Sequence, residues 1–171
     1  CRVSCAFILT TSACYVAANK RSPMFAQGSN NQELSCTKPA RCDFSEFPHA
    51  RIKHVALGYE TSVFVCESGT VYVCGVNARG CMGINQETES YSTSLPIIVP
   101  PELIGNEKCV YAGAAALTVC LVTEMKGSPN THHLYCAGSN QFGECASGSF
   151  LPQRITTFRK VESSLMDNER V

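Results

Sequence analysis

The sequence predicts an all-β fold built from small, repeated sheets, and three observations lead to this prediction. The chain has 171 residues, of which 44% are hydrophobic and 16% are charged, which suits a packed core. A hexapeptide with an aromatic residue, a glycine and an asparagine at fixed positions occurs three times. Short apolar runs rich in β-branched residues surround two of these copies. Together these features indicate internal duplication of a β-rich unit.

The hexapeptide reads FAQGSN at 25–30, YVCGVN at 72–77 and YCAGSN at 135–140. The spacing between successive copies differs, so insertions lie between or inside the units. Its glycines (Gly28, Gly75, Gly138) are expected to allow a close approach of the backbone at the end of a strand. Its asparagines (Asn30, Asn77, Asn140) suit the turn that follows, where a short side chain can bond its own backbone. The motif is therefore interpreted as architectural, and no catalytic residue is assigned.

The second unit gives the clearest secondary structure. VALG at 55–58 and SVFVC at 62–66 are expected strands, ESGT at 67–70 is a turn with Gly69 at positive φ, and VYVCG at 71–75 is the returning strand. These runs are apolar at successive positions, as in a sheet that is buried on both faces. Small sheets covered on both faces and repeated along a chain are typical of a β-propeller.

Further matches define the units. Val55-x-x-Gly58 is similar to Val110-x-x-Gly113, and a proline (Pro39, Pro96 or Pro152) leads into an apolar segment before each copy or after the last one. The predicted units are a divergent first repeat at 1–36, a second at 37–86, a third with insertions at 87–148, and the start of an incomplete fourth at 149–171.

These motifs resemble the regulator of chromosome condensation repeat family. Its pattern V-x-x-G-x-x-H-S, followed by D-G-x-V-Y-x-W-G-x-N-x-x-G, is matched best over 52–83, and the Gly-x-Asn-x-x-Gly step is characteristic. The resemblance assigns these structural motif residues: Gly28, Asn30, Gly58, Gly75, Asn77, Gly80, Gly113, Gly138, Asn140 and Gly143. It implies a partial β-propeller, with about three blades of a ring that normally has seven.

The copies depart from the family pattern. Thr61 and Ala116 stand where the family has histidine, and no tryptophan occurs in the chain. Cys74, Ala137 and Gln27 take the tryptophan position, and Glu33 takes a glycine position. Because three blades leave open faces and edges, we expect the chain to be part of a longer one; completion of a ring by further copies, or an unusually capped arc, are the alternatives. The absence of an initial Met indicates that the start of the gene product lies elsewhere or is not shown.

Twelve cysteines allow two interpretations. A secreted protein would form disulfides, whereas an intracellular one would keep small buried thiols. Cys66, Cys74, Cys120 and Cys136 lie inside strand-like runs, which favours reduced core thiols. The only close pair, Cys1 and Cys5, lacks a second pair for zinc, and His132 and His133 are neighbours in a loop-like insertion at 125–133. No metal, cofactor or phosphate-binding loop is predicted, and the protein is not expected to be an enzyme.

The net charge is zero and no basic cluster or long apolar run occurs, which argues against nucleic-acid binding and against a membrane span. The insertions at 85–108 and 125–133, the second of which is expected to lengthen a hairpin, are better candidates for recognition, since loops on a rigid scaffold often carry it. Tyr91, Arg79, Phe142 and His133 are of types enriched at contact hot spots.

We predict a protein-interaction scaffold, intracellular in the cytoplasm or nucleus, as part of a larger propeller. The resemblance implies partners among small GTPases, chromatin or ubiquitin-ligase components. Two alternatives remain open: a guanine-nucleotide exchange factor for a Ran-type small GTPase, and a secreted disulfide-rich binding protein.

Overall fold

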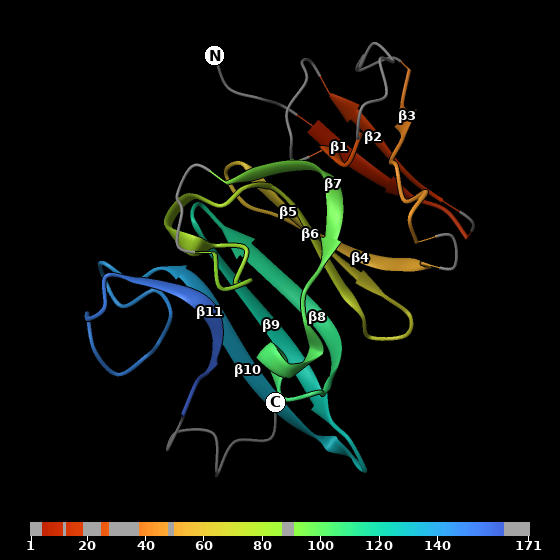
Figure 1. The fold of residues 1–171 in the computed structure, drawn as a ribbon. Helices are drawn as coiled ribbons and strands as arrows, with labels where there is room; N and C mark the ends of the chain where they lie inside the picture. Colours follow the sequence, from red (N-terminus) through yellow and green to blue (C-terminus); the bar gives the residue numbers. More distant parts are fainter. Residues whose placement is uncertain are drawn as a thin grey trace.

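Three antiparallel sheets make up the fold in the computed structural model (Figure 1). The structure describes residues 5–11, 13–18, 25–27, 38–47, 50–86 and 91–162. The helical elements in this part of the chain are short 3-10 turns, η2 (Ala78–Gly80) and η3 (Pro101–Ile104) among them, and turns and loops join the other strands. The all-β prediction is therefore confirmed. None of the described residues forms a helix that is both long and apolar enough to cross a membrane.

Each sheet is a run of antiparallel neighbours. The first contains β1 (Cys5–Leu9), β2 (Cys14–Ala18) and β3 (Ala40–Arg41). The second contains β4 (Ile52–Leu57), β5 (Thr61–Cys66), β6 (Val71–Val76) and β7 (Ser92–Ile98). The third contains β8 (Lys108–Ala115), β9 (Thr118–Met125), β10 (Ser128–Ser139) and β11 (Arg154–Lys160). The second and third sheets are thus four-stranded and built in the same order.

The second sheet follows the sequence prediction closely. All six residues of β5 are buried, and so are five of the six in β6. The turn between them contains Gly69 at a φ of 88°, as expected for ESGT. Successive buried residues on one strand point to opposite faces, so both faces of this sheet must be covered.

The last strand of each sheet follows or contains one of the prolines noted in the sequence. Pro39 directly precedes β3, Pro96 lies within β7, and Pro152 lies two residues before the first residue of β11. Each of these strands pairs with the strand that carries or precedes the hexapeptide region. The proline-led segments therefore close the preceding sheet as its outer strand.

Aromatic rings fill the interface between the first and second sheets. Phe64 of β5 contacts Phe7 and Phe44 edge to face, with ring centroids 5.5 and 5.2 Å apart. Tyr72 of β6 packs against Phe44 and Phe47. Such edge-to-face pairs add to the stabilisation that burial of the rings provides. Cys14, Cys42, Cys66 and Cys74 complete this cluster as buried thiols.

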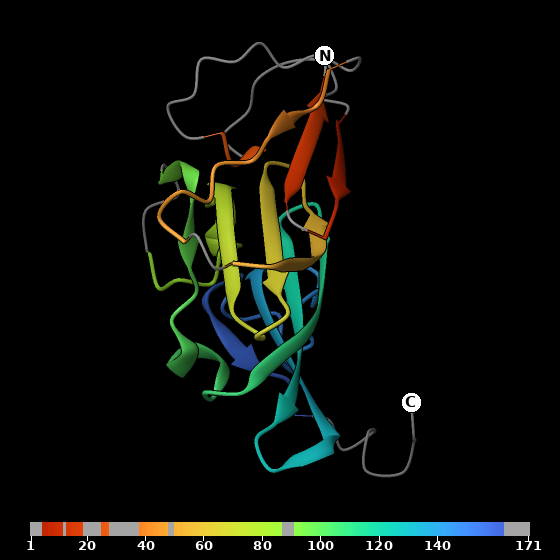
Figure 2. The same cartoon turned by 90° about the vertical axis from the view of Figure 1, so that its right-hand side faces the viewer.

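Aliphatic residues form the second interface, on the opposite face of β5 and β6. Val63, Val65, Val71 and Val73 pack against the third sheet, where Val119 and Leu121 of β9 face them. The two clusters show that the three sheets stack as successive layers, which Figure 2 displays from the side. The second sheet is the middle layer, and the β9–β10 hairpin extends past it at the bottom of that view.

The insertion at 125–133 lengthens the β9–β10 hairpin as predicted, but it is mostly strand and not loop-like, because β10 begins at Ser128 and β9 ends at Met125. One expectation about the glycines is wrong. The matched glycines differ in place: Gly113 lies inside β8 opposite Cys120, whereas Gly58 lies in the turn after β4. The β4–β5 and β8–β9 connections have the same length, since Gly58 faces Thr61 as Ala115 faces Thr118, and this register makes Ala56, opposite Val63, the residue equivalent to Gly113.

Candidate interaction site

The glycines of the second and third hexapeptides have the same conformation. Gly75 has a φ of 116° and Gly138 a φ of 115°. A Cβ on Gly75 would lie 2.0 Å from the carbonyl oxygen of Glu60, and a Cβ on Gly138 would lie 2.1 Å from that of Leu117. Since those oxygens belong to the backbone of the neighbouring turn, no side chain fits at either position.

The asparagines that follow are fully buried and bind the backbone of the next loop. Asn77 accepts a hydrogen bond at Oδ1 from the amide of Met82, 2.9 Å away, and donates from Nδ2 to the carbonyl of Gln86. The Oδ1 of Asn140 accepts from the amide of Cys145, and its Nδ2 lies 2.8 Å from the carbonyl oxygen of Ser149. Each amide therefore fixes a loop of about ten residues, further than the single turn expected from the sequence.

The loop after Asn77 also joins the second sheet to the third. Gly80 lies so close to Thr156 of β11 that a Cβ would be 2.8 Å from its Cα, and Gly83 lies against the ring of Phe158. The amide of Asn85 donates to the carbonyl of Thr156. The corresponding loop in the third unit contains Gly143, where a Cβ would meet only the ring of Phe150, at 3.4 Å. Gly28 and Asn30 of the first copy lie outside the described residues.

Both insertions of the sequence line one pocket of about 500 Å³. Its walls come from the β5–β6 turn, from the segment between β7 and β8, and from the β9–β10 hairpin. Val71, Val99 and Ile104 are buried in these walls. The sequence indicated each insertion separately, but only the stacking of the second and third sheets brings them together.

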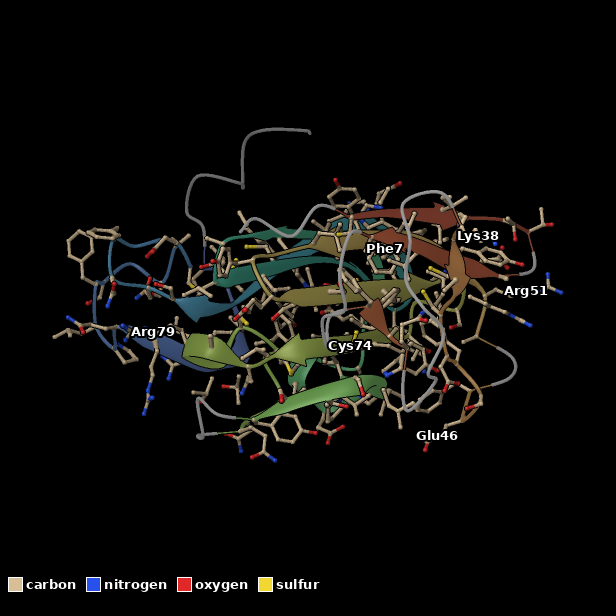
Figure 3. All side chains as sticks on the ribbon, turned by 90° about the horizontal axis from the view of Figure 1, so that it is seen from above. Phe7, Lys38, Glu46, Arg51, Cys74 and Arg79 are labelled. Carbon is tan, nitrogen blue, oxygen red and sulfur yellow. The ribbon has the colours of Figure 1, made fainter. Side chains whose placement is uncertain are left out.

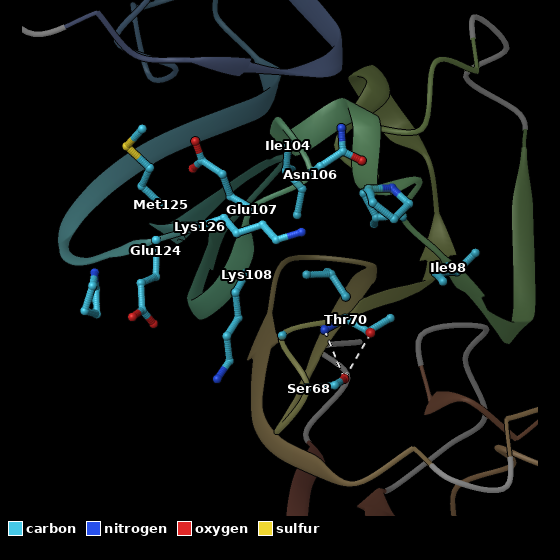
Figure 4. A pocket seen from close by; sticks show the side chains of 16 residues that line it. Ser68, Thr70, Ile98, Ile104, Asn106, Glu107, Lys108, Glu124, Met125 and Lys126 are labelled. Atoms are coloured by element: carbon cyan, nitrogen blue, oxygen red, sulfur yellow. Dashed lines mark hydrogen bonds between the residues drawn. The ribbon is translucent and has the colours of Figure 1, made fainter.

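The rim of this pocket combines apolar and charged side chains. Ile98 and Met125 are each 43% exposed, and Figure 4 shows them on different sides of the pocket. Lys108 and Lys126 are exposed beside them and form no ion pair within the described part of the chain. We define Ile98, Lys108, Met125 and Lys126 as the pocket rim. Such a mixture is typical of surfaces that bind a partner.

A buried polar network supports the wall that carries Glu107. Its carboxylate accepts a hydrogen bond from the Thr123 hydroxyl, and its Oε1 lies 2.7 Å from Nδ1 of His133. Thr123 is fully buried, and the side chains of His133 and Glu107 are 19% and 12% exposed. Because the network satisfies both carboxylate oxygens, Glu107 has the role of a fixed structural group. It orders the start of β8, which carries Lys108, and the β9–β10 hairpin, which carries Lys126.

The other residues singled out as contact types do not gather at this pocket. Arg79 lies at the opposite end of the sheets from Arg51, which flanks the β5–β6 turn (Figure 3). Phe142 is 83% exposed in the loop after β10. Tyr91 packs against the core between the second and third sheets. Only His133 belongs to the neighbourhood of the pocket, through its contact with Glu107.

The cysteines act as core residues in this structure. None of the ten described cysteines forms a disulfide. Burial raises the pKa of Cys66 and of Cys109 to about 11, which keeps both thiols protonated near neutral pH. No group of three or more His, Cys, Asp or Glu residues in the described segments is arranged to hold a metal ion.

Solved structures with the same architecture are β-propellers. Human WBSCR16 is 19% identical, with a TM-score of 0.69, over 96% of this chain and 39% of that one. Prp20p from Saccharomyces cerevisiae, studied for its binding to Gsp1p and histones, is 16% identical over 95% of this chain and 37% of that one, with a TM-score of 0.73. The yeast RCC1 (Prp20) bound to Kap60 is 16% identical over 95% and 36%, with a TM-score of 0.70.

The fold is therefore that of a partial β-propeller, and the chain spans less than two fifths of the length of these structures. A family model described as the regulator of chromosome condensation (RCC1) repeat matches residues 52–81. The repeat that the sequence resembles is thus present in the second sheet. The comparison with curated proteins found no match.

We expect Gly138→Ala to lower the free energy of unfolding by at least about 2 kcal/mol, because the new methyl group meets backbone atoms at a positive φ. Urea denaturation followed by circular dichroism measures this change. Gly113→Ala is the control: no atom lies within 4 Å of its Cβ position and its φ is not positive, so the free energy should stay equal or rise slightly. Equal losses in the two variants would contradict the assigned role of Gly138.

Asn140→Ala should cost about 2–4 kcal/mol of unfolding free energy, since it leaves the Cys145 amide and the carbonyls of Ser149 and Pro152 without their partner. Thermal and urea denaturation measure the loss. Ser147→Ala removes only the hydrogen bond that Nδ2 of Asn140 donates to the Ser147 hydroxyl. Because Ser147 is exposed, the free energy of unfolding should change by less than about 0.5 kcal/mol. A similar effect of both variants would argue against the amide as the centre of the loop.

Proposed function

We propose that the chain is a protein-interaction scaffold of RCC1-type repeats within a larger propeller, and that the pocket between its second and third sheets binds an apolar side chain of a partner protein. The observation that carries the proposal is the convergence of both insertions on this one pocket. Binding proteins often carry their recognition residues on loops, and a rigid, buried sheet positions those loops.

The chemistry of the pocket indicates the kind of segment it takes. Buried Val71, Val99 and Ile104 offer apolar walls, and the rim residues Ile98 and Met125 extend them to the surface. A volume of about 500 Å³ accommodates a large aliphatic or aromatic anchor. Lys108 and Lys126 attract carboxylates beside the anchor, and Glu124, the cross-strand partner of Lys108, restricts this attraction to the side of the pocket where Lys126 lies.

The same proposal covers the repeat units and their motif residues. We infer repeats at 1–36, 37–86 and 87–148, and a fourth that begins at 149. In these repeats, the motif glycines and asparagines named in the sequence analysis have a structural role. The similarity to Prp20p, which was studied with histones, supports work inside the cell, in the cytoplasm or nucleus. Small GTPases, chromatin and ubiquitin-ligase components are the partner classes to test.

Selection of phage-displayed random peptides on the immobilised chain tests the pocket. We expect enriched peptides to share an apolar anchor beside acidic residues, and to bind a Met125→Glu variant at least about tenfold more weakly by fluorescence polarisation. Tyr59→Glu is the matched control, because Tyr59 is 73% exposed in the β4–β5 turn, away from the pocket. Enriched peptides that bind Met125→Glu and the parent chain equally would contradict the proposal.

A second candidate is guanine-nucleotide exchange on a Ran-type small GTPase. The observation that favours it is the similarity in fold to Prp20p, which was studied for binding to Gsp1p. The pocket is lined by residues at the starts of β6 and β10, whereas Arg79 and the exposed Phe142 lie in the loops that follow these strands. The two surfaces are therefore at opposite ends of the sheets, and both activities are compatible in one chain.

Release of a fluorescent GDP analogue from a Ran-type GTPase measures exchange directly. If the chain has this activity, the release rate should rise with the concentration of the chain, and the Met125→Glu variant should retain the increase. A release rate that stays at the intrinsic value over all concentrations of folded chain would exclude exchange activity for this chain while leaving the pocket proposal unaffected.

A further inference from the structure

Cys120 of β9 and Cys136 of β10 are directly opposite partners in the third sheet, and their sulfur atoms lie 2.7 Å apart. Directly opposed residues on antiparallel strands have Cα atoms about 4.5–5.5 Å apart. This separation falls within the range of about 4.4–6.8 Å that a disulfide spans. The two sulfurs can therefore be joined without movement of the strands.

The equivalent positions in the second sheet hold a different pair. Val63 and Val73 are cross-strand partners there, and both are fully buried against the third sheet. Alignment of the two sheets on Thr61 with Thr118 and on Gly75 with Gly138 places Cys120 at the position of Val63 and Cys136 at that of Val73. Packing alone is satisfied by an aliphatic pair, so it does not require thiols at this point.

The pair lies on the outer face of the third sheet, which no other described sheet covers. Cys136 is 2% exposed, whereas Cys120 is half-buried and is therefore the more accessible of the two thiols in this chain. The hydrogen bond from Cys136 lowers the pKa of Cys120, and the same bond raises the pKa of Cys136. Cys120 is thus the better nucleophile of the two, because the thiolate is the reactive form of cysteine.

We propose that Cys120 and Cys136 are a redox modification site, at which a low-molecular-weight disulfide such as oxidised glutathione forms a reversible cross-strand disulfide. The Cys120 thiolate attacks one sulfur of the oxidant and displaces one glutathione thiolate, which leaves a mixed disulfide on Cys120. The Cys136 sulfur then attacks Sγ of Cys120 and displaces the second glutathione. The pair loses two electrons and two protons, and the oxidant is reduced to two molecules of glutathione.

Other thiols compete for the same oxidant, and the test must separate them. Cys145 belongs to the same cluster of buried residues, but burial raises its pKa to about 12. Cys14 and Cys42 are hydrogen-bonded to each other at the interface of the first and second sheets. Cys109 faces the second sheet on the far side of the third.

The experiment uses the whole chain, incubated with oxidised glutathione, alkylated, and digested with trypsin without reduction. Lys126 lies between the two cysteines, so the disulfide joins two tryptic peptides that mass spectrometry identifies. We expect the linked pair to form and to disappear when dithiothreitol is added. We also expect it in Cys109→Ala and in Cys145→Ala, the controls for the other cysteines on the same peptides.

Cys120→Val and Cys136→Val each introduce the residue of the second sheet, so the fold should persist, and each should abolish the linked peptides. Cys120→Ser serves the same purpose if a valine variant does not fold. The reversible bond should also raise the thermal midpoint of the oxidised parent chain, and not that of Cys120→Val. Persistence of the link in Cys120→Val, its loss in Cys145→Ala, or no link in the folded parent chain would overturn the proposal.

Discussion

The architecture depends on the burial of both faces of the second sheet. Phe64 and Tyr72 point to the first sheet, while Val63 and Val73, next to them on the same strands, point to the third. Exposing either face to water would destabilise the fold, because several fully buried apolar side chains on each face would lose the free energy of their burial. The second sheet therefore requires a neighbour on both sides, and the stacking that follows places the insertions, the pocket and the loops.

Much of this arrangement is predictable from the sequence because the signals are local. The apolar run SVFVC, the turn at Gly69 and the returning strand VYVCG specify a hairpin by composition and periodicity. The repetition of Gly-x-Asn identifies equivalent places in the units, and the matching backbone angles of Gly75 and Gly138 agree with that equivalence. Local patterns of this kind need no knowledge of distant contacts.

The sequence was less informative where long-range contacts decide. The match between Gly58 and Gly113 fails because strand pairing makes Ala115 the equivalent of Gly58, two residues further along the chain than the local sequence match indicated. The insertion at 125–133 lengthens a hairpin as predicted, but its polar composition did not indicate that most of it forms strand paired with β9. The pocket combines residues from three distant segments, so it depends on how two sheets meet. The network of Glu107, Thr123 and His133 was missed for the same reason.

The outer strand of each sheet has a mechanical consequence. β7 pairs with β6, although the chain between them carries the Asn77 loop and residues of the following predicted unit. Neighbouring units are thus connected by main-chain hydrogen bonds in addition to side-chain packing. A force that pulls one unit from the next must break all the hydrogen bonds between β6 and β7 together. The units should therefore separate only at a high force, and not one by one.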